Sequence, residues 1–195
     1  MSLLRTLARA ENHPAIDAGE VVLRHPVAAD FEPWRRVRKA SYEFLKPWEP
    51  TWPRDDLTRY AFRRRVRCYT REMRNGRAVA FFLFTRGSDC LVGGITVSNI
   101  RRGICQSGTI GYWMGQPYAR KGYMTAALKA LVPFCFDQLK LHRLEAACIP
   151  DNEASVGLLK KSGFQHEGYA RGYLKINGVW RDHLLFARMA ADPPG

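Results

Sequence analysis

The feature that most limits the possible folds is the order in which helical and strand patterns follow one another along the chain. β-Branched and aromatic runs at 78–85 and 91–100 flank the turn Arg86-Gly87-Ser88-Asp89, which predicts a hairpin. Similar runs predict further strands at 21–24, 109–114, 144–149, 164–175 and 180–189. Helical patterns are predicted at about 30–42, 55–73, 124–139 and 153–161. The chain is therefore expected to be an α/β protein with a mixed central sheet.

The 195 residues contain no repeat and no convincing linker, so a single domain is expected. We assign 1–20 to a loosely ordered N-terminal arm, 21–190 to the domain and 191–195 to a C-terminal tail. No apolar run approaches the ~20 residues that a membrane-spanning helix needs. The N-terminal arm lacks the continuous apolar stretch of a secretory signal, so a cytoplasmic protein without membrane contact is expected.

The cysteines argue against both a disulfide framework and a zinc site. There are five of them, widely spaced and without a C-x-x-C pair. Their neighbours are mostly apolar, which favours reduced, buried thiols. His142 and His183 have no partner at metal-ligand spacing, so no metal is predicted.

Positive charge is concentrated in one segment of a chain whose formal net charge is +13. Between Arg54 and Arg77 there are nine arginines against three acidic residues. Such a cluster attracts anionic partners, namely nucleic acid, a ribosome or a polyphosphate cofactor. The alternative is an ordinary solvated helix face, and composition does not choose between the two.

Two further segments carry possible site chemistry. At 110–125 a strand runs into the basic turn Arg120-Lys121-Gly122 and then directly into a helix, whose free N–H groups can bind an anion. The alternative is that Gly122 only eases the turn. At 150–164, Asn152 or Asp151 caps a short helix that stops at Gly163, and capping alone would explain that pattern.

Together these two segments resemble the GNAT superfamily of N-acetyltransferases, which place a [QR]-x-x-G-x-[GA] pyrophosphate loop on a helix, followed by an Asn-led helix ending in Gly-Phe. Three flanking segments, 44–50, 98–103 and 167–183, are similar to the RimJ branch, within the RimJ/RimL group. Enzymes of that branch acetylate the N-terminal alanine of a small-subunit ribosomal protein. The resemblance extends over about 21–189.

The resemblance implies a single-domain GNAT fold with helices on both faces and a sheet splayed between two parallel strands, 109–114 and 144–149. It implies acetyl-CoA as the acetyl donor. Transferred position by position, the expected cofactor-binding residues are Tyr112, Trp113, Met114, Arg120, Lys121, Gly122, Tyr123, Met124, Thr125 and Asn152.

At the expected catalytic positions the sequence departs from the family pattern. The usual acid tyrosine is Leu159, and the Ser three residues after the Asn, which RimL-type enzymes use instead, is present as Ser155. The RimL-type base position is Leu174, so Glu49 and Glu145 are the candidates for a weak base. The alternative for both is a carboxylate that balances the arginine excess. The pyrophosphate loop also begins with Ala119 rather than Gln or Arg.

Three functions therefore remain open. The first is acetylation of the N-terminal alanine of a ribosomal protein, with ribosome or rRNA contact through 54–77. The second is acetylation of a small amine, such as an amino acid, polyamine or antibiotic. The third is a ribosome- or RNA-binding protein in which catalysis is secondary.

Overall fold

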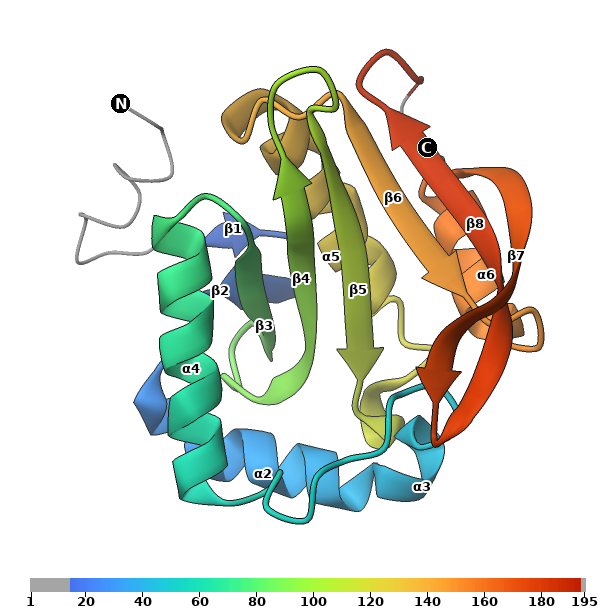
Figure 1. Cartoon of the computed structure of the whole chain (residues 1–195). Coiled ribbons are helices and arrows are strands. Elements are labelled where there is room, and N and C mark those ends of the chain that lie inside the picture. The colour runs from blue at the N-terminus through green and yellow to red at the C-terminus, as the bar shows by residue number, and fades with distance from the viewer. Residues whose placement is uncertain (1–14, 194–195) are drawn as a thin grey trace.

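An eight-stranded sheet forms the centre of the molecule (Figure 1), in a computed structural model that describes residues 15–193. Its strands lie in the order β1-β2-β3-β4-β5-β6-β8-β7. The strands are β1 (Ile16–Asp17), β2 (Val21–Arg24), β3 (Val79–Thr85), β4 (Leu91–Arg101), β5 (Ser107–Met114), β6 (Arg143–Cys148), β7 (Gln165–Ile176) and β8 (Val179–Met189). Neighbouring strands are antiparallel except for β5 and β6, which confirms the mixed sheet.

Helices cover both faces of this sheet, as expected (Figure 1). They are η1 (Ala28–Asp30), α2 (Phe31–Ala40), α3 (Tyr42–Leu45), α4 (Arg59–Arg74), η2 (Gln116–Tyr118), α5 (Tyr123–Pro133), η3 (Phe134–Gln138) and α6 (Glu153–Lys161). Residues of α2 and α4 pack in one core cluster, whereas α5 and α6 contribute to the other. None of the helices within 15–193 is long and apolar enough to cross a membrane.

The alternation of side chains along β3 explains why the protein has two cores. Phe81 and Leu83 pack in the larger cluster with α5, and Phe82 and Phe84 pack in the smaller cluster with α2 and α4. Successive side chains of a strand point to opposite faces, so one continuous apolar run supplies both layers.

The parallel pair β5–β6 is joined over only part of its length. Register pairs run from Ser107 with Arg143 to Thr109 with Glu145, and the two strands then separate. Residues 110–114 therefore stay paired with β4 on one side, while their other edge has no strand partner within the described sheet.

Two helices differ from the prediction for physical reasons. Helix α4 begins after Thr58, whose Oγ1 accepts a bond from Ala61 N, because Asp55 and Asp56 pair with arginines instead of capping. The helix predicted over 124–139 changes to a π-helical turn after Pro133, which has no N–H to donate.

β1 lies within the predicted N-terminal arm and pairs with β2; residues 1–14 lie outside the described part of the chain. The cysteine expectation is also corrected. Cys135 and Cys148 are buried, but Cys68, Cys90 and Cys105 are exposed. All five are free thiols.

Candidate active site

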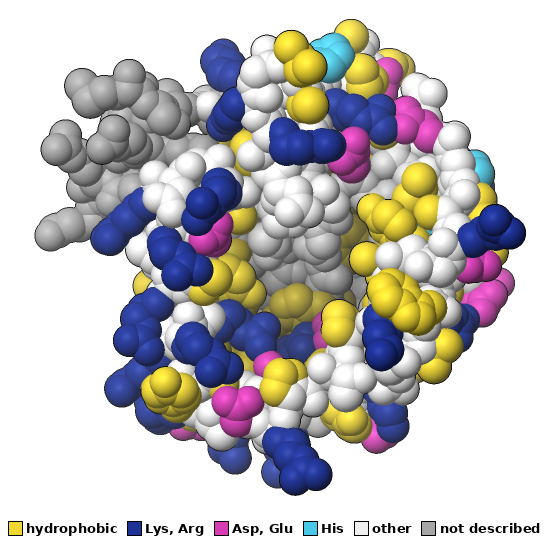
Figure 2. Space-filling model, in the orientation of Figure 1, with side chains coloured by type: hydrophobic (Ala, Val, Ile, Leu, Met, Phe, Trp, Pro, Cys, Tyr) yellow, Lys and Arg dark blue, Asp and Glu magenta, His cyan; other side chains and the backbone are white. Residues whose placement is uncertain are grey.

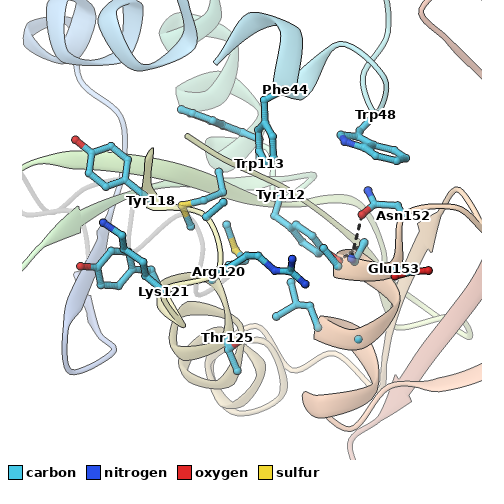
Figure 3. Close-up of a pocket in the computed structure, with 18 of the residues that line it drawn as sticks. Phe44, Trp48, Tyr112, Trp113, Tyr118, Arg120, Lys121, Thr125, Asn152 and Glu153 are labelled. Atoms are coloured by element: carbon cyan, nitrogen blue, oxygen red, sulfur yellow. Dashed lines mark hydrogen bonds between the residues drawn. The ribbon is translucent and has the colours of Figure 1, made fainter. Parts of the chain in front are cut away.

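A pocket of about 740 Å³ opens where β5 and β6 separate (Figure 3). Four segments line it: α3 with the loop that follows, the end of β5, the turn leading into α5, and the start of α6. Every residue that the sequence assigned to cofactor binding lines this pocket. Ser155 and Glu49 line it too, whereas Glu145 does not.

Tyr112 and Trp113 of β5 point to opposite faces of the sheet. The part of β5 that borders the pocket between these side chains is therefore the edge of its backbone. Tyr112 packs against the larger core cluster, and Trp113 packs against the smaller one. The Trp113 ring lies over Gly94 on β4, where an added Cβ would come within 2.6 Å of the indole nitrogen. Gly94 is therefore required for the indole to lie in this position.

The turn between β5 and α5 provides positive charge and free backbone donors. Arg120 and Gly122 both have positive φ, of 61° and 84°, and Gly122 is the N-cap of α5. The N–H groups of the first turn have no partner within the helix, and the helix dipole is positive at this end. A Cβ placed on Gly122 would meet nothing within 4 Å, so the space beside this backbone is open.

Three side chains form a hydrogen-bonded group at the start of α6. Asn152 Oδ1 accepts a bond from Ser155 N at 3.1 Å, which caps the helix. Ser155 is buried, and its Oγ lies 2.6 Å from the hydroxyl oxygen of Tyr112. Burial raises the pKa of Tyr112 despite this bond, so the phenol remains neutral at physiological pH.

Burial raises the pKa of the Cys148 thiol near the end of β6, and the neighbouring Ser155 side chain opposes that effect.

Glu49 is held by three hydrogen bonds although it lines the pocket. Its two carboxylate oxygens accept from Nη1 and Nη2 of Arg38, both at 2.7 Å, and Trp52 Nε1 donates to Oε2 at 2.7 Å. Arg38 is itself buried and stacks on the Trp52 and Trp113 rings. This carboxylate therefore joins α2 to the loop after α3.

Glu145 lies on β6 at the last paired position of the β5–β6 ladder. It forms ion pairs with Arg101 and Arg143, both at 3.1 Å. Among the aromatic residues of the loop after α3 and of the β7–β8 hairpin, Trp48 lines the pocket, whereas Tyr173 and Trp180 are exposed.

Three features of the site were missed from the sequence. The side-chain contact between Tyr112 and Ser155 joins residues 43 positions apart, and no local pattern indicates it. Arg38 was missed because its partner lies beyond the bend between α2 and α3. Phe44 also lines the pocket, and the aromatic composition of that loop was the available signal. Within the described residues, no group of three or more His, Cys, Asp or Glu could hold a metal ion.

Comparison with known proteins agrees with this geometry. Residues 20–165 match the family model described as an acetyltransferase (GNAT) domain. The chain is 39% identical over 130 residues to the probable N-acetyltransferase YjcK of Bacillus subtilis, covering 67% of this chain and 72% of that protein. It is 37% identical over 151 residues to the ribosomal protein uS5-alanine N-acetyltransferase of Escherichia coli, covering 76% and 77%.

Among solved structures, Mycobacterium smegmatis RimJ in complex with CoA-disulfide superposes with a TM-score of 0.84 at 35% identity, covering 91% of this chain and 86% of that one. The ribosomal-protein-S5-alanine acetyltransferase of Vibrio fischeri gives 0.86 at 28% identity, covering 92% and 98%. The family model spans well over half of the chain, and the fold and the pocket agree with it. The chain therefore belongs to the GNAT family of N-acetyltransferases.

Proposed function

We propose that this enzyme transfers the acetyl group of acetyl-CoA to the N-terminal α-amine of a ribosomal protein, with alanine as the first residue. The observation that carries the proposal is the convergence of three features in one pocket: the open edge of β5, the basic turn at α5, and the Ser155 hydroxyl between them. The relatives named for alanine acetylation support this acceptor. Such a substrate pair places the reaction in the cytoplasm.

The residues present fit the two halves of the donor. The backbone of 112–114 offers N–H and C=O groups to the amides of an extended pantetheine arm, and one of these N–H groups would polarise the thioester carbonyl. The pyrophosphate would lie on the free N–H groups of 122–125, with Arg120 and Lys121 adding charge. Asn152 would contact the donor from the start of α6.

In the reaction, the neutral amine attacks the thioester carbonyl carbon, the C–N bond forms and the C–S bond breaks. The amine gives up one proton to solvent, and the departing sulfur takes one. We assign Ser155 as the donor to that sulfur and Tyr112 as the neighbour that orients the Ser155 hydroxyl. Alignment of the amine against the carbonyl supplies much of the rate.

An α-amine needs little help to lose its proton. Its pKa lies near 8, so a fraction is already neutral at pH 7, whereas a lysine amine near 10.4 is almost entirely charged. Glu49 is occupied by Arg38 and Trp52, and Glu145 lies outside the pocket. We therefore propose that no carboxylate acts as an indispensable base, and that Glu49 shapes the acceptor side of the pocket.

The acceptor is tested by comparing initial rates on three substrates at equal concentration with acetyl-CoA. They are an Ala-led peptide, the same peptide N-terminally blocked and containing lysine, and spermidine. We expect the free Ala-led peptide to react and the blocked one to remain unmodified. Efficient acetylation of the blocked peptide would reject the α-amine assignment, and preference for spermidine would favour a small-amine enzyme.

A further inference from the structure

The exposed face of α4 carries arginines that the protein does not use for its own folding. Five of the nine arginines between Arg54 and Arg77 form ion pairs: Arg59, Arg64, Arg65, Arg71 and Arg77. Their partners include all three acidic residues of the segment. Within residues 15–193, Arg63, Arg67 and Arg74 contact no carboxylate, hydrogen-bond acceptor or aromatic ring, and all three are exposed.

These three arginines share one side of the helix. At 100° per residue, Arg67 and Arg74 lie within about 40° of Arg63 around the axis, and the row is about 16 Å long at 1.5 Å per residue. Tyr60, which is 67% exposed, projects on the same side at the start of the helix. We call Tyr60, Arg63, Arg67 and Arg74 the arginine face. Figure 2 shows Lys and Arg side chains gathered on the side of the molecule where α4 lies.

A groove borders this face. Its lining includes Arg64, Arg65, Arg67 and Arg71 together with the turn at 53–56. The groove shares no residue with the catalytic pocket. It is therefore a second concave surface, on the opposite core layer from α5 and α6, in which Asp55 and Asp56 pair with Arg64 and Arg65 while Arg67 has no carboxylate partner within the described residues.

We propose that the arginine face binds RNA, with guanidinium groups on successive phosphates and the Tyr60 ring stacked on an unpaired base. Unpaired arginines in a row provide fixed donors for phosphate oxygens. An exposed aromatic ring among them matches the combination of cation and stacking surface that proteins use for RNA with single-stranded elements. An acidic protein segment would use the arginines but would have no use for the ring.

The test is fluorescence anisotropy with a labelled RNA hairpin of twelve base pairs and an unpaired loop, titrated between 50 and 200 mM salt. The test variant is Arg63→Ala/Arg67→Ala/Arg74→Ala. The control variant, Lys129→Ala/Lys140→Asn/Lys160→Ala, removes the same charge from exposed lysines outside the arginine face and the pocket lining. Three lost phosphate contacts should lower the slope of log K against log salt by about 2–3 and weaken binding on the order of tenfold at 50 mM salt. The control variant should bind like wild type.

Tyr60→Ala should weaken binding of the hairpin more than binding of a blunt duplex without the loop. Both arginine-face variants should keep wild-type circular dichroism and wild-type acetylation of a free peptide, so failure here is separable from failure of the proposed function. Equal affinity and salt slope in the test and control variants would overturn the proposal. Binding of a deca-glutamate peptide that needs the three arginines, without RNA binding, would also overturn it and identify an acidic protein partner.

Discussion

Replacement of Glu49 tests whether this carboxylate stabilises the structure or acts as a catalytic base. The carboxylate accepts three hydrogen bonds, and the ion pair is largely buried, with 6% of the Arg38 side chain and 19% of the Glu49 side chain exposed. Glu49→Gln keeps the shape but removes the charge, and its amide group turns two donors toward a buried guanidinium. Loss of one partner of a buried ion pair costs about 3–5 kcal/mol of folding free energy. Because the glutamine keeps one acceptor oxygen, the cost of Glu49→Gln should lie near the lower of these values.

At about 2–4 °C per kcal/mol for a chain of this size, the expected fall in Tm is about 6–12 °C. The matched control is Glu43→Gln, in the same region of the chain. Its side chain is 81% exposed, and its ion pair with Lys46 is long, at 3.8 Å, so replacing it should not change Tm measurably. Arg38→Met/Glu49→Leu removes both charges and should recover part of the stability lost in Glu49→Gln.

Thermal unfolding and steady-state acetylation of an Ala-led peptide are measured on the same preparations. Glu49→Gln should lose less activity per folded molecule than the ~10²–10⁴-fold expected for removal of a general base. If Tm is unchanged and kcat/KM falls by that factor or more, Glu49 is the base and the structural interpretation is refuted.

The remaining predictions concern the donor side and the pH dependence. Gly122→Val should weaken acetyl-CoA binding strongly in a calorimetric titration. The control, Gly87→Val, has a similar φ of 88° and equally open surroundings and should bind acetyl-CoA normally. Normal binding by Gly122→Val would contradict the turn assignment. Ser155→Ala should lower kcat and destabilise the fold by about 1 kcal/mol because the partly buried Tyr112 hydroxyl loses its partner. Ser155→Ala/Tyr112→Phe should regain that stability in urea unfolding without regaining turnover; recovered turnover would exclude Ser155 as the acid. The rate on an Ala-led peptide should be half-maximal near pH 8 and reach its plateau at higher pH, following the substrate amine. Burial, which raises the pKa of Tyr112, should prevent a second limb below pH 10.

The parts of the fold that depend on local sequence were predictable. The β3–β4 hairpin follows from two β-rich runs around a Gly-containing turn, and α6 from its Asn152 cap and Gly163 stop. The strand, turn and helix of 110–125 were predictable for the same reason, because they form one continuous segment, and their role in binding acetyl-CoA stays a prediction. The chemistry of this segment depends on backbone groups, so Ala119 in place of the usual Gln or Arg does not remove the donors.

The parts that depend on distant contacts were not predictable. Glu49 was a candidate base because only its neighbours in sequence were visible, and the bend that brings Arg38 to it is a tertiary feature. Asp56 was expected to cap α4, but its ion pair with Arg65 takes the carboxylate away from the helix start. Cys68 was expected to be buried because the neighbours of the cysteines are mostly apolar. It is exposed because the packing of Phe62 and Met73 decides which face of α4 is buried.

The early separation of β5 and β6 also affects how the protein avoids aggregation. An unpaired strand edge on a surface invites another chain to add a strand. Here the open edge at 110–114 lies between two strands of one sheet, and its residues 112–114 line a pocket whose other walls include the starts of α5 and α6. The outer edges are less inviting: β1 has two residues, and β7 is interrupted by two register shifts and carries Arg171 and Lys175. The open backbone edge of β5 is therefore bounded by elements of the same chain, which leave room for an extended molecule to pair with it inside the pocket.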